Sequence, residues 1–160
     1  TETLVTTISS PWKVSMNNKS ATFDKLTSWH ENSDPDIKYF SGTATYENTF
    51  NLETKPMDTE RSRSVFLDLG DVKNIAEVFV NGKSMGVVWK KPFKVDISGA
   101  VKAGNNSIKI EVTNTWVNRL IGDAQPNANK TTFTTMPFYR ADSPLVPAGL
   151  LGEVKVIGVK

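Results

Sequence analysis

The feature that most constrains the fold is an alternation of apolar and polar side chains along several segments. From residue 43 the chain reads TATYENTFNL, in which every second side chain from Ala44 to Leu52 falls on one face. From residue 107 it reads SIKIEVTNTW, in which Ile108, Ile110 and Val112 share a face. A period of two is the spacing of a β-strand whose two faces meet different surroundings. The pattern predicts half-buried antiparallel strands.

Turn residues agree with this interpretation. The apolar run IAEVFV leads into Asn81-Gly82, and MGVVW follows. Asn and Gly accept a positive φ, so this order is typical of a two-residue β-hairpin. Helical patterns are scarce. We expect at most one short turn near residues 96–101 and another near residues 26–31.

The longest region without a strand pattern runs from Gly122 to Gly149 and contains four prolines. Loops of this length are uncommon in a compact domain and are usually functional or disordered. A short strand at residues 131–135 is one alternative. With eight to ten strands in 160 residues, we predict one all-β domain over residues 1–160, a two-sheet antiparallel β-sandwich of the jelly-roll type with a long loop at 122–149.

Composition excludes several classes of protein. The 19 basic and 17 acidic residues nearly cancel and are scattered, which is unlike the clustered charge of a nucleic-acid-binding protein. No apolar run is long enough to cross a bilayer. The absence of cysteine excludes disulfides and thiolate metal sites. Because the chain begins with Thr1 rather than Met, we expect a processed or excised piece of a longer protein, in which the lack of a signal peptide carries no information.

Enzymatic and metal sites have little support. The only histidine, His30, has no partner for a metal site or a catalytic triad, and we expect it to be exposed or locally hydrogen-bonded. A pair of carboxylates for glycoside hydrolysis stays open as an alternative, since sequence spacing does not fix their separation. The acidic SDPD stretch at residues 33–36 is the best candidate for a structural calcium, although these residues also form ordinary turns. We therefore predict no catalytic residue, metal site or cofactor.

Sugar recognition needs an aromatic platform beside planar hydrogen-bonding groups. The segment TWVNRLIGD, which we expect to end a strand, and the segment FYR in the long loop combine these residue types. The candidate ligand-binding residues are Trp89, Trp116, Asn118, Arg119, Asp123, Tyr139 and Arg140.

Structural roles compete for several of these residues. Trp116 is in phase with the apolar face at residues 108–112, and we favour a core position for it. Arg119 and Asp123 are also suited to a structural ion pair, and Trp89 to packing under the next turn. Trp12 and Trp29 are expected to be core anchors.

Several of these segments together resemble the sugar-binding domain of family 2 glycoside hydrolases. The order includes a strand with Leu-Asp-Leu-Gly, a V-N-G-x-x-x-G hairpin, a P-F-x-x-D-I strand and G-x-N-x-I-x-I-x-V-x-N. In this chain the last three stand at residues 80–86, 92–97 and 104–114. Residues 116–123 (WVNRLIGD) and 147–156 (PAGLLGEVKV) look more like the C-terminal domain of bacterial α-L-rhamnosidase-type enzymes.

The resemblance implies a galactose-binding-like jelly roll without catalytic residues of its own. It also implies that the loop at residues 123–149 leans toward a separate catalytic barrel. We therefore expect a carbohydrate-binding or docking module of a secreted or periplasmic bacterial enzyme that degrades polysaccharides, with carbohydrate or the catalytic domain as partner. The alternatives are a structural sandwich without a ligand and a small carboxylate-dependent glycosidase.

Overall fold

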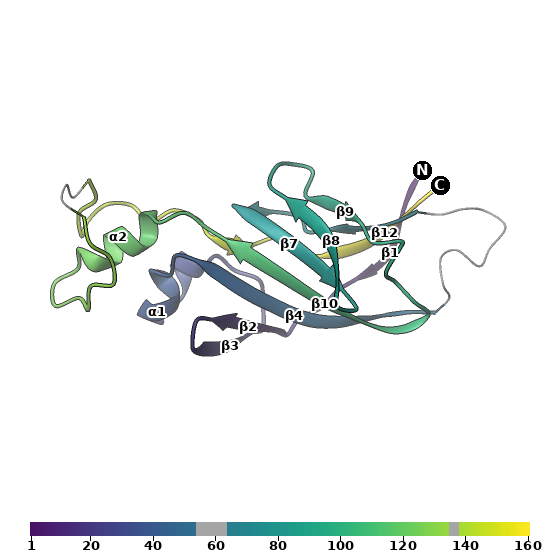
Figure 1. The fold of residues 1–160 in the computed structure, drawn as a ribbon, viewed down its shortest axis with the longest axis horizontal. Coiled ribbons are helices and arrows are strands. Elements are labelled where there is room, and N and C mark those ends of the chain that lie inside the picture. Colours follow the sequence, from purple (N-terminus) through teal and green to yellow (C-terminus); the bar gives the residue numbers. More distant parts are fainter. Residues whose placement is uncertain (54–63, 135–137) are drawn as a thin grey trace.

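The computed structural model describes residues 1–53, 64–134 and 138–160. In it two large antiparallel β-sheets face one another, and a third sheet has only two strands (Figure 1). The larger sheet has the strand order β3-β2-β4-β10-β7-β8. Its strands are β2 (Trp12–Met16), β3 (Lys19–Phe23), β4 (Thr43–Leu52), β7 (Ile75–Val80), β8 (Lys83–Val88) and β10 (Gly104–Thr113). The smaller sheet has the order β1-β12-β5-β9. Its strands are β1 (Glu2–Thr7), β5 (Ser64–Asp68), β9 (Lys94–Asp96) and β12 (Lys155–Val159). The predicted all-β jelly-roll sandwich is confirmed.

The centre of the larger sheet is the pair β4 and β10, which match residue for residue from Gly104 opposite Leu52 to Thr113 opposite Thr43. Their inward side chains alternate as the sequence predicted, and Tyr46, Ile110 and Val112 are fully buried. Trp12 and Trp29 are also fully buried, so both are the core anchors expected.

The hairpin predicted at Asn81-Gly82 joins β7 to β8. Both turn residues have positive φ, 51° for Asn81 and 82° for Gly82, as the primed hairpin turns require. The Asn81 side chain donates to the carbonyl of Ala100 at 2.8 Å and to Oδ1 of Asn106 at 2.9 Å. The hairpin is thereby tied to the start of β10 and to the turn that precedes it.

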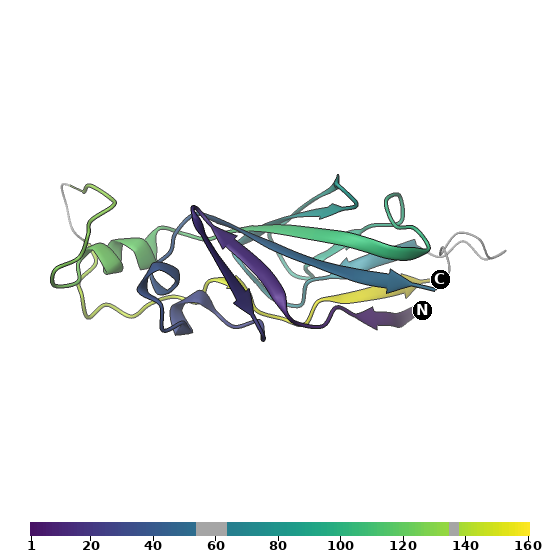
Figure 2. The ribbon, with the colours of Figure 1, turned by 90° about the horizontal axis from the view of Figure 1, so that it is seen from below.

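Short helices lie at one end of the sandwich, beyond β4 and β10 (Figures 1 and 2). A 3₁₀ turn, η1 (Trp29–Glu31), confirms the turn expected near residues 26–31, and α1 (Pro35–Lys38) follows it. The Asp34 side chain accepts a hydrogen bond from the backbone of Asp36 and so caps α1. The third helix, α2 (Val117–Asp123), was not predicted.

Two sequence predictions are corrected at this end. Residues 117–123 are helical rather than the end of a strand, because β10 stops at Thr113 and the next residue, Asn114, bonds to Phe40 and Gly42 with its side chain. The core position favoured for Trp116 is wrong, since the strand phase is lost at this turn and the side chain is 61% exposed.

The long loop begins after α2 and therefore covers residues 124–148 rather than 122–149. It ends at β11 (Gly149–Leu150), which pairs with β6 (Val72–Lys73). Residues 131–134 form no strand, and Thr135 lies outside the described residues. The loop and α2 stand at the end of the molecule opposite the two termini, and we call this end the apex (Figure 1).

Candidate functional site

The apex contains most of the residues that the sequence proposed for ligand binding. Asn118, Arg119 and Asp123 lie on α2, Trp116 immediately precedes the helix, and Tyr139 and Arg140 follow in the loop. Trp89 does not join them. It follows β8, the opposite edge strand of the larger sheet, and its side chain is 66% exposed.

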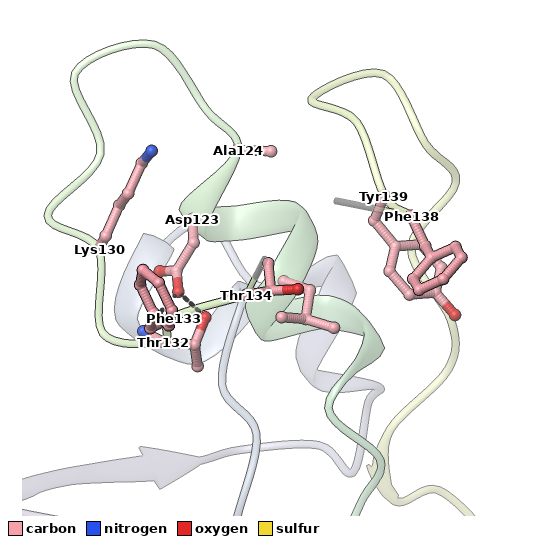
Figure 3. A pocket seen from close by; sticks show the side chains of 9 residues that line it. Asp123, Ala124, Lys130, Thr132, Phe133, Thr134, Phe138 and Tyr139 are labelled. Carbon is pink, nitrogen blue, oxygen red and sulfur yellow. Dashed lines mark hydrogen bonds between the residues drawn. The ribbon is translucent and has the colours of Figure 1, made fainter. Parts of the chain in front are cut away.

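The carboxylate of Asp123 is engaged within the chain. Its Oδ1 lies 2.9 Å from Nη2 of Arg119, one helical turn earlier. The backbone amides of Thr131 and Thr132 donate to it at 3.1 Å and 2.8 Å, and the Thr132 hydroxyl adds a third hydrogen bond. Asp123 therefore joins the end of α2 to the first half of the loop, as Figure 3 shows for Thr132.

The surroundings of Asp123 act on its charge in opposite directions. Burial raises the pKa of the carboxyl group. The hydrogen bonds from Thr132 and Thr131 and the charge of Arg119 lower it by more, so the pKa lies below its ordinary value. The ion pair that the sequence offered as the structural alternative for Arg119 and Asp123 is present.

Asn118 is fully buried and also serves the loop. Its Nδ2 donates to the carbonyl of Val146 at 2.8 Å, and its Oδ1 accepts from the amide of Val146 at 2.8 Å. Both polar atoms of this side chain are thus paired with the last part of the loop. Asn118 and Asp123 fasten the loop at two places to the same short helix.

A cavity of about 350 Å³ lies between α2 and the loop (Figure 3). Phe133 stands on one side of it, and Phe138 and Tyr139 stand on the other. Phe133 and Phe138 are 91% and 81% exposed, the two most exposed large apolar side chains of the described residues. Arg140 is exposed beside them, and its backbone amide bonds to Ser143. This part of the apex therefore exposes two large apolar side chains next to the charged side chains of Lys130 and Arg140.

A second concavity, of about 760 Å³, lies on the side of the apex nearest β2 and β3, and we call it the Trp116 groove. Five segments meet there: the β2–β3 hairpin end, α1, the connection from α1 to β4, the start of α2 and the loop. The residues that line the groove are Met16, Asn17, Asn18, Lys19, Asp36, Phe40, Ser41, Gly42, Trp116, Arg119 and Thr131.

The sequence analysis missed the contribution of Asn17 and Asn18 to this groove. Both are exposed in the turn between β2 and β3, and β2 pairs with β4. The consecutive asparagines marked a turn, but only the strand order carries that turn toward α2. Phe133 was likewise overlooked, because an isolated aromatic in a loop has no periodic pattern around it.

The acidic stretch considered for calcium has a different role in the described structure. Asp34 and Asp36 both contact Nζ of Lys19, the latter at 3.0 Å. In residues 1–53, 64–134 and 138–160, no three His, Cys, Asp or Glu side chains gather as a metal site would require. The single histidine is locally hydrogen-bonded as expected, with Nδ1 of His30 2.5 Å from the hydroxyl of Ser28.

No helix in the described part of the chain has the length and apolar character needed to span a bilayer.

Comparison with known proteins identifies relatives for nearly the whole chain. Residues 2–142 match the family described as "Glycosyl hydrolases family 2, sugar binding domain". A putative beta-glucuronidase from Formosa agariphila is 38% identical over an alignment of 158 positions, and the matched part is 84% of this chain and 13% of that protein.

Solved structures agree. A rhamnosidase from Novosphingobium sp. PP1Y superposes with a TM-score of 0.93 and 43% identity, covering 99% of this chain and 15% of that one. A beta-D-glucuronidase of Dictyoglomus thermophilum has a TM-score of 0.69 at 18% identity over 99% of this chain and 28% of that one, and it shares the fold. The chain thus spans only a small part of the length of each relative.

Proposed function

The chain belongs to the sugar-binding domain family of family 2 glycosyl hydrolases, and from this premise we propose that it works as a non-catalytic module of a larger bacterial glycoside hydrolase. In that enzyme the module would form one continuous domain over residues 1–160, whose apex packs against the catalytic part. Rhamnose- and glucuronate-containing polysaccharides are the first candidate substrates of the whole enzyme, because two relatives are a rhamnosidase and a putative beta-glucuronidase. We propose that the enzyme is periplasmic or extracellular, where its polysaccharide substrates are found.

The observation that carries this proposal is the apolar surface at the apex. Phe133 and Phe138 are almost fully exposed on a loop that α2 holds in place. Single exposed apolar residues are common, but two exposed phenylalanines beside an apolar cavity are typical of a contact surface. Protein-protein contacts gain most from such aromatic side chains when they enter a pocket of the partner.

Three carboxylates with roles in the fold fit a module without catalysis. Asp68 accepts from the amide of Gly70, and Asp96 accepts from the amide and hydroxyl of Ser98, so both shape turns. Asp123 is committed to Arg119 and the loop. A general acid or a nucleophile needs a carboxyl group that faces the substrate.

The first test is hydrolysis by the 160-residue chain itself. We expect no release of nitrophenol from 4-nitrophenyl α-L-rhamnoside or 4-nitrophenyl β-D-glucuronide above the rate in buffer. Turnover that rises in proportion to protein concentration and survives further purification would refute the non-catalytic assignment.

The second test concerns the apex within the full-length enzyme. The double substitution Phe133→Ser and Phe138→Ser should lower the melting temperature of the catalytic part or raise KM, because the contact loses its aromatic anchors. Trp89→Ser, which removes another exposed aromatic from the edge strand β8 of the larger sheet, is the control and should change neither quantity. Equal behaviour of the two variants would contradict docking through the apex.

A further inference from the structure

We propose that the Trp116 groove is a carbohydrate-binding subsite that takes a neutral pyranose, with the indole of Trp116 as the stacking platform. The assignment rests on the proposed function, which it deepens by naming the site and the class of sugar. It concerns a different surface from the apolar cavity between Phe133 and Phe138. The two surfaces share none of their lining residues.

Trp116 is exposed because β10 ends at Thr113 and the chain turns before α2 begins. Trp116 precedes α2 with φ −77° and ψ −3°, a conformation that begins the helix and leaves its side chain 61% exposed. An indole offers a large, rigid apolar face, and it stacks on the C–H face of a sugar with little loss of side-chain entropy. An exposed tryptophan alone would be unremarkable. What distinguishes Trp116 from Trp89 is that polar groups converge around it.

The rim of the groove supplies these groups. Asn17 and Asn18 present two exposed amides from the β2–β3 turn. Each amide has both donors and acceptors, as sugar hydroxyls require of their partners. The Asp36 side chain is 77% exposed and contacts Lys19 through Oδ2, so it can accept further hydrogen bonds from hydroxyl groups. An apolar platform with a few convergent polar groups is the usual composition of a small-ligand site.

Arg119 also lines the groove. Its Nη2 is held by Asp123, and its backbone amide donates to the hydroxyl of Ser41 at 3.2 Å. Its Nε is the one buried side-chain polar atom without a hydrogen-bond partner in the described part of the chain. Arg119 therefore fixes the shape of the groove beside Trp116.

The charges of the groove favour a neutral sugar over a uronate. Each cation that lines the groove already has a carboxylate partner: Lys19 contacts Asp34 and Asp36, and Arg119 contacts Asp123. These groups carry two positive and three negative charges. A sugar carboxylate would meet matched cations and the exposed charge of Asp36, whereas a neutral pyranose would meet no such repulsion.

The size of the groove is consistent with this ligand. Its volume of about 760 Å³ falls within the range of ordinary small-molecule sites. The site is open, however, and a monosaccharide makes few contacts. We therefore expect a Kd on the order of a few millimolar, from the ligand efficiency typical of small ligands.

Nuclear magnetic resonance of the tryptophan side chains tests the proposal directly. The chain has four tryptophans, and each gives one indole N–H signal in a ¹⁵N spectrum. Trp116→Phe and Trp89→Phe assign the two exposed ones. Titration with methyl α-L-rhamnopyranoside, a neutral pyranose, should shift the Trp116 signal along a saturating curve and leave the signals of Trp12, Trp29 and Trp89 in place.

Two variants and one further ligand complete the experiment. Trp116→Ala should weaken binding at least about tenfold, whereas Trp89→Ala should leave the Kd unchanged, and neither should alter the melting temperature because both side chains are exposed. Asn18→Ala should weaken binding less than Trp116→Ala does. D-glucuronate should bind several-fold more weakly than the rhamnoside.

Three results would overturn the proposal. The first is a Trp116 signal that does not move even at the solubility limit of the rhamnoside. The second is an equal affinity of the Trp116→Ala variant and the unsubstituted chain for the rhamnoside. The third is tighter binding of D-glucuronate than of the rhamnoside. None of these results would contradict the proposed non-catalytic role, which is tested by the hydrolysis assay and by the Phe133 and Phe138 substitutions. Conversely, hydrolysis by the chain would refute the accessory role without deciding where a sugar stacks.

Discussion

Removal of the Asp123 carboxylate tests whether α2 holds the long loop as the structure indicates. In Asp123→Ala the amides of Thr131 and Thr132 lose their acceptor, and Arg119 loses its ion-pair partner. The carboxylate is buried, so its removal takes three hydrogen bonds and one ion pair from the interior of the apex. We expect the variant to fold, because Asp123 lies outside the core of the sandwich, but to be clearly less stable.

The size of the loss follows from the contacts. Breaking a buried ion pair by removing one partner costs about 3–5 kcal/mol. The lower figure applies, because the Arg119 side chain is 19% exposed and can turn toward water. For a domain of this size each kcal/mol lowers the melting temperature by about 2–4 °C. The expected decrease is therefore about 6–12 °C, if the apex unfolds together with the sandwich.

Calorimetry measures this decrease, and hydrogen exchange locates it. The amides of Thr131 and Thr132 should lose protection in Asp123→Ala even if the loop opens by itself and the global transition moves less. Asp142→Ala, which removes an exposed carboxylate from the same loop, is the matched control and should leave both measurements unchanged. A decrease under about 2 °C together with unchanged exchange at both amides would refute the anchoring role.

The pH dependence gives an independent check. The pKa of Asp123 is lower in the folded state than its ordinary value of 3.8. Its contribution to stability is therefore fully present above that value and is lost as the pH falls through the lower folded pKa. The difference in unfolding free energy between the unsubstituted chain and Asp123→Asn should be constant near neutral pH and should shrink below about pH 4. A difference that persists undiminished in acid would show that the charge is not its source.

Two further predictions concern close packing and a buried phenol. Gly122→Ala should destabilise the chain by about 1–3 kcal/mol in a denaturant titration, because a Cβ there would lie 2.6 Å from Cβ of Tyr39. This clash should outweigh the better helix propensity of alanine. The control Gly99→Ala, whose Cβ would meet only the end of a flexible lysine at 3.7 Å, should be nearly neutral. Burial raises the pKa of Tyr46 to about 12, so the unfolded chain releases this proton first and stability should fall as the pH rises above about 10. Tyr46→Phe should remove this pH dependence. It should also lower the free energy of unfolding by about 1–3 kcal/mol at neutral pH, since Nε1 of Trp29 donates to the phenol oxygen at 2.6 Å. If urea titrations of the variant show the same fall in stability above pH 10 as the unsubstituted chain, the assignment is contradicted.

The strands could be predicted because their two faces meet different surroundings. In β4 and β10 the alternation continues over ten residues, and it fixes both the strands and the buried face. The hairpin at Asn81-Gly82 was equally accessible, since a two-residue turn with positive φ restricts the residue types.

The apex could not be predicted in the same way. α2 has seven residues and no side-chain cap, so it is too short to show a clear helical periodicity in the sequence. Trp116 continued the spacing of β10 in the sequence, but the chain turns at Asn114 and the phase is lost. The spacing of Arg119 and Asp123, four residues apart, was the one helical signal. From the sequence this spacing indicates an ion pair, but a single pair is too little to predict the helix that brings the two side chains together.

Both ends of the loop at residues 124–148 are fixed to the body of the domain. Asp123 and Asn118 fasten it from α2, and the amide of Trp29 donates to the carbonyl of Ala148 at 3.0 Å where β11 begins. Substitutions between these points can change the shape and chemistry of the exposed rim at little expense to the folding of the two sheets. The same scaffold can therefore be adapted to different neighbours through changes in one segment, much as an antibody varies its loops over a constant framework.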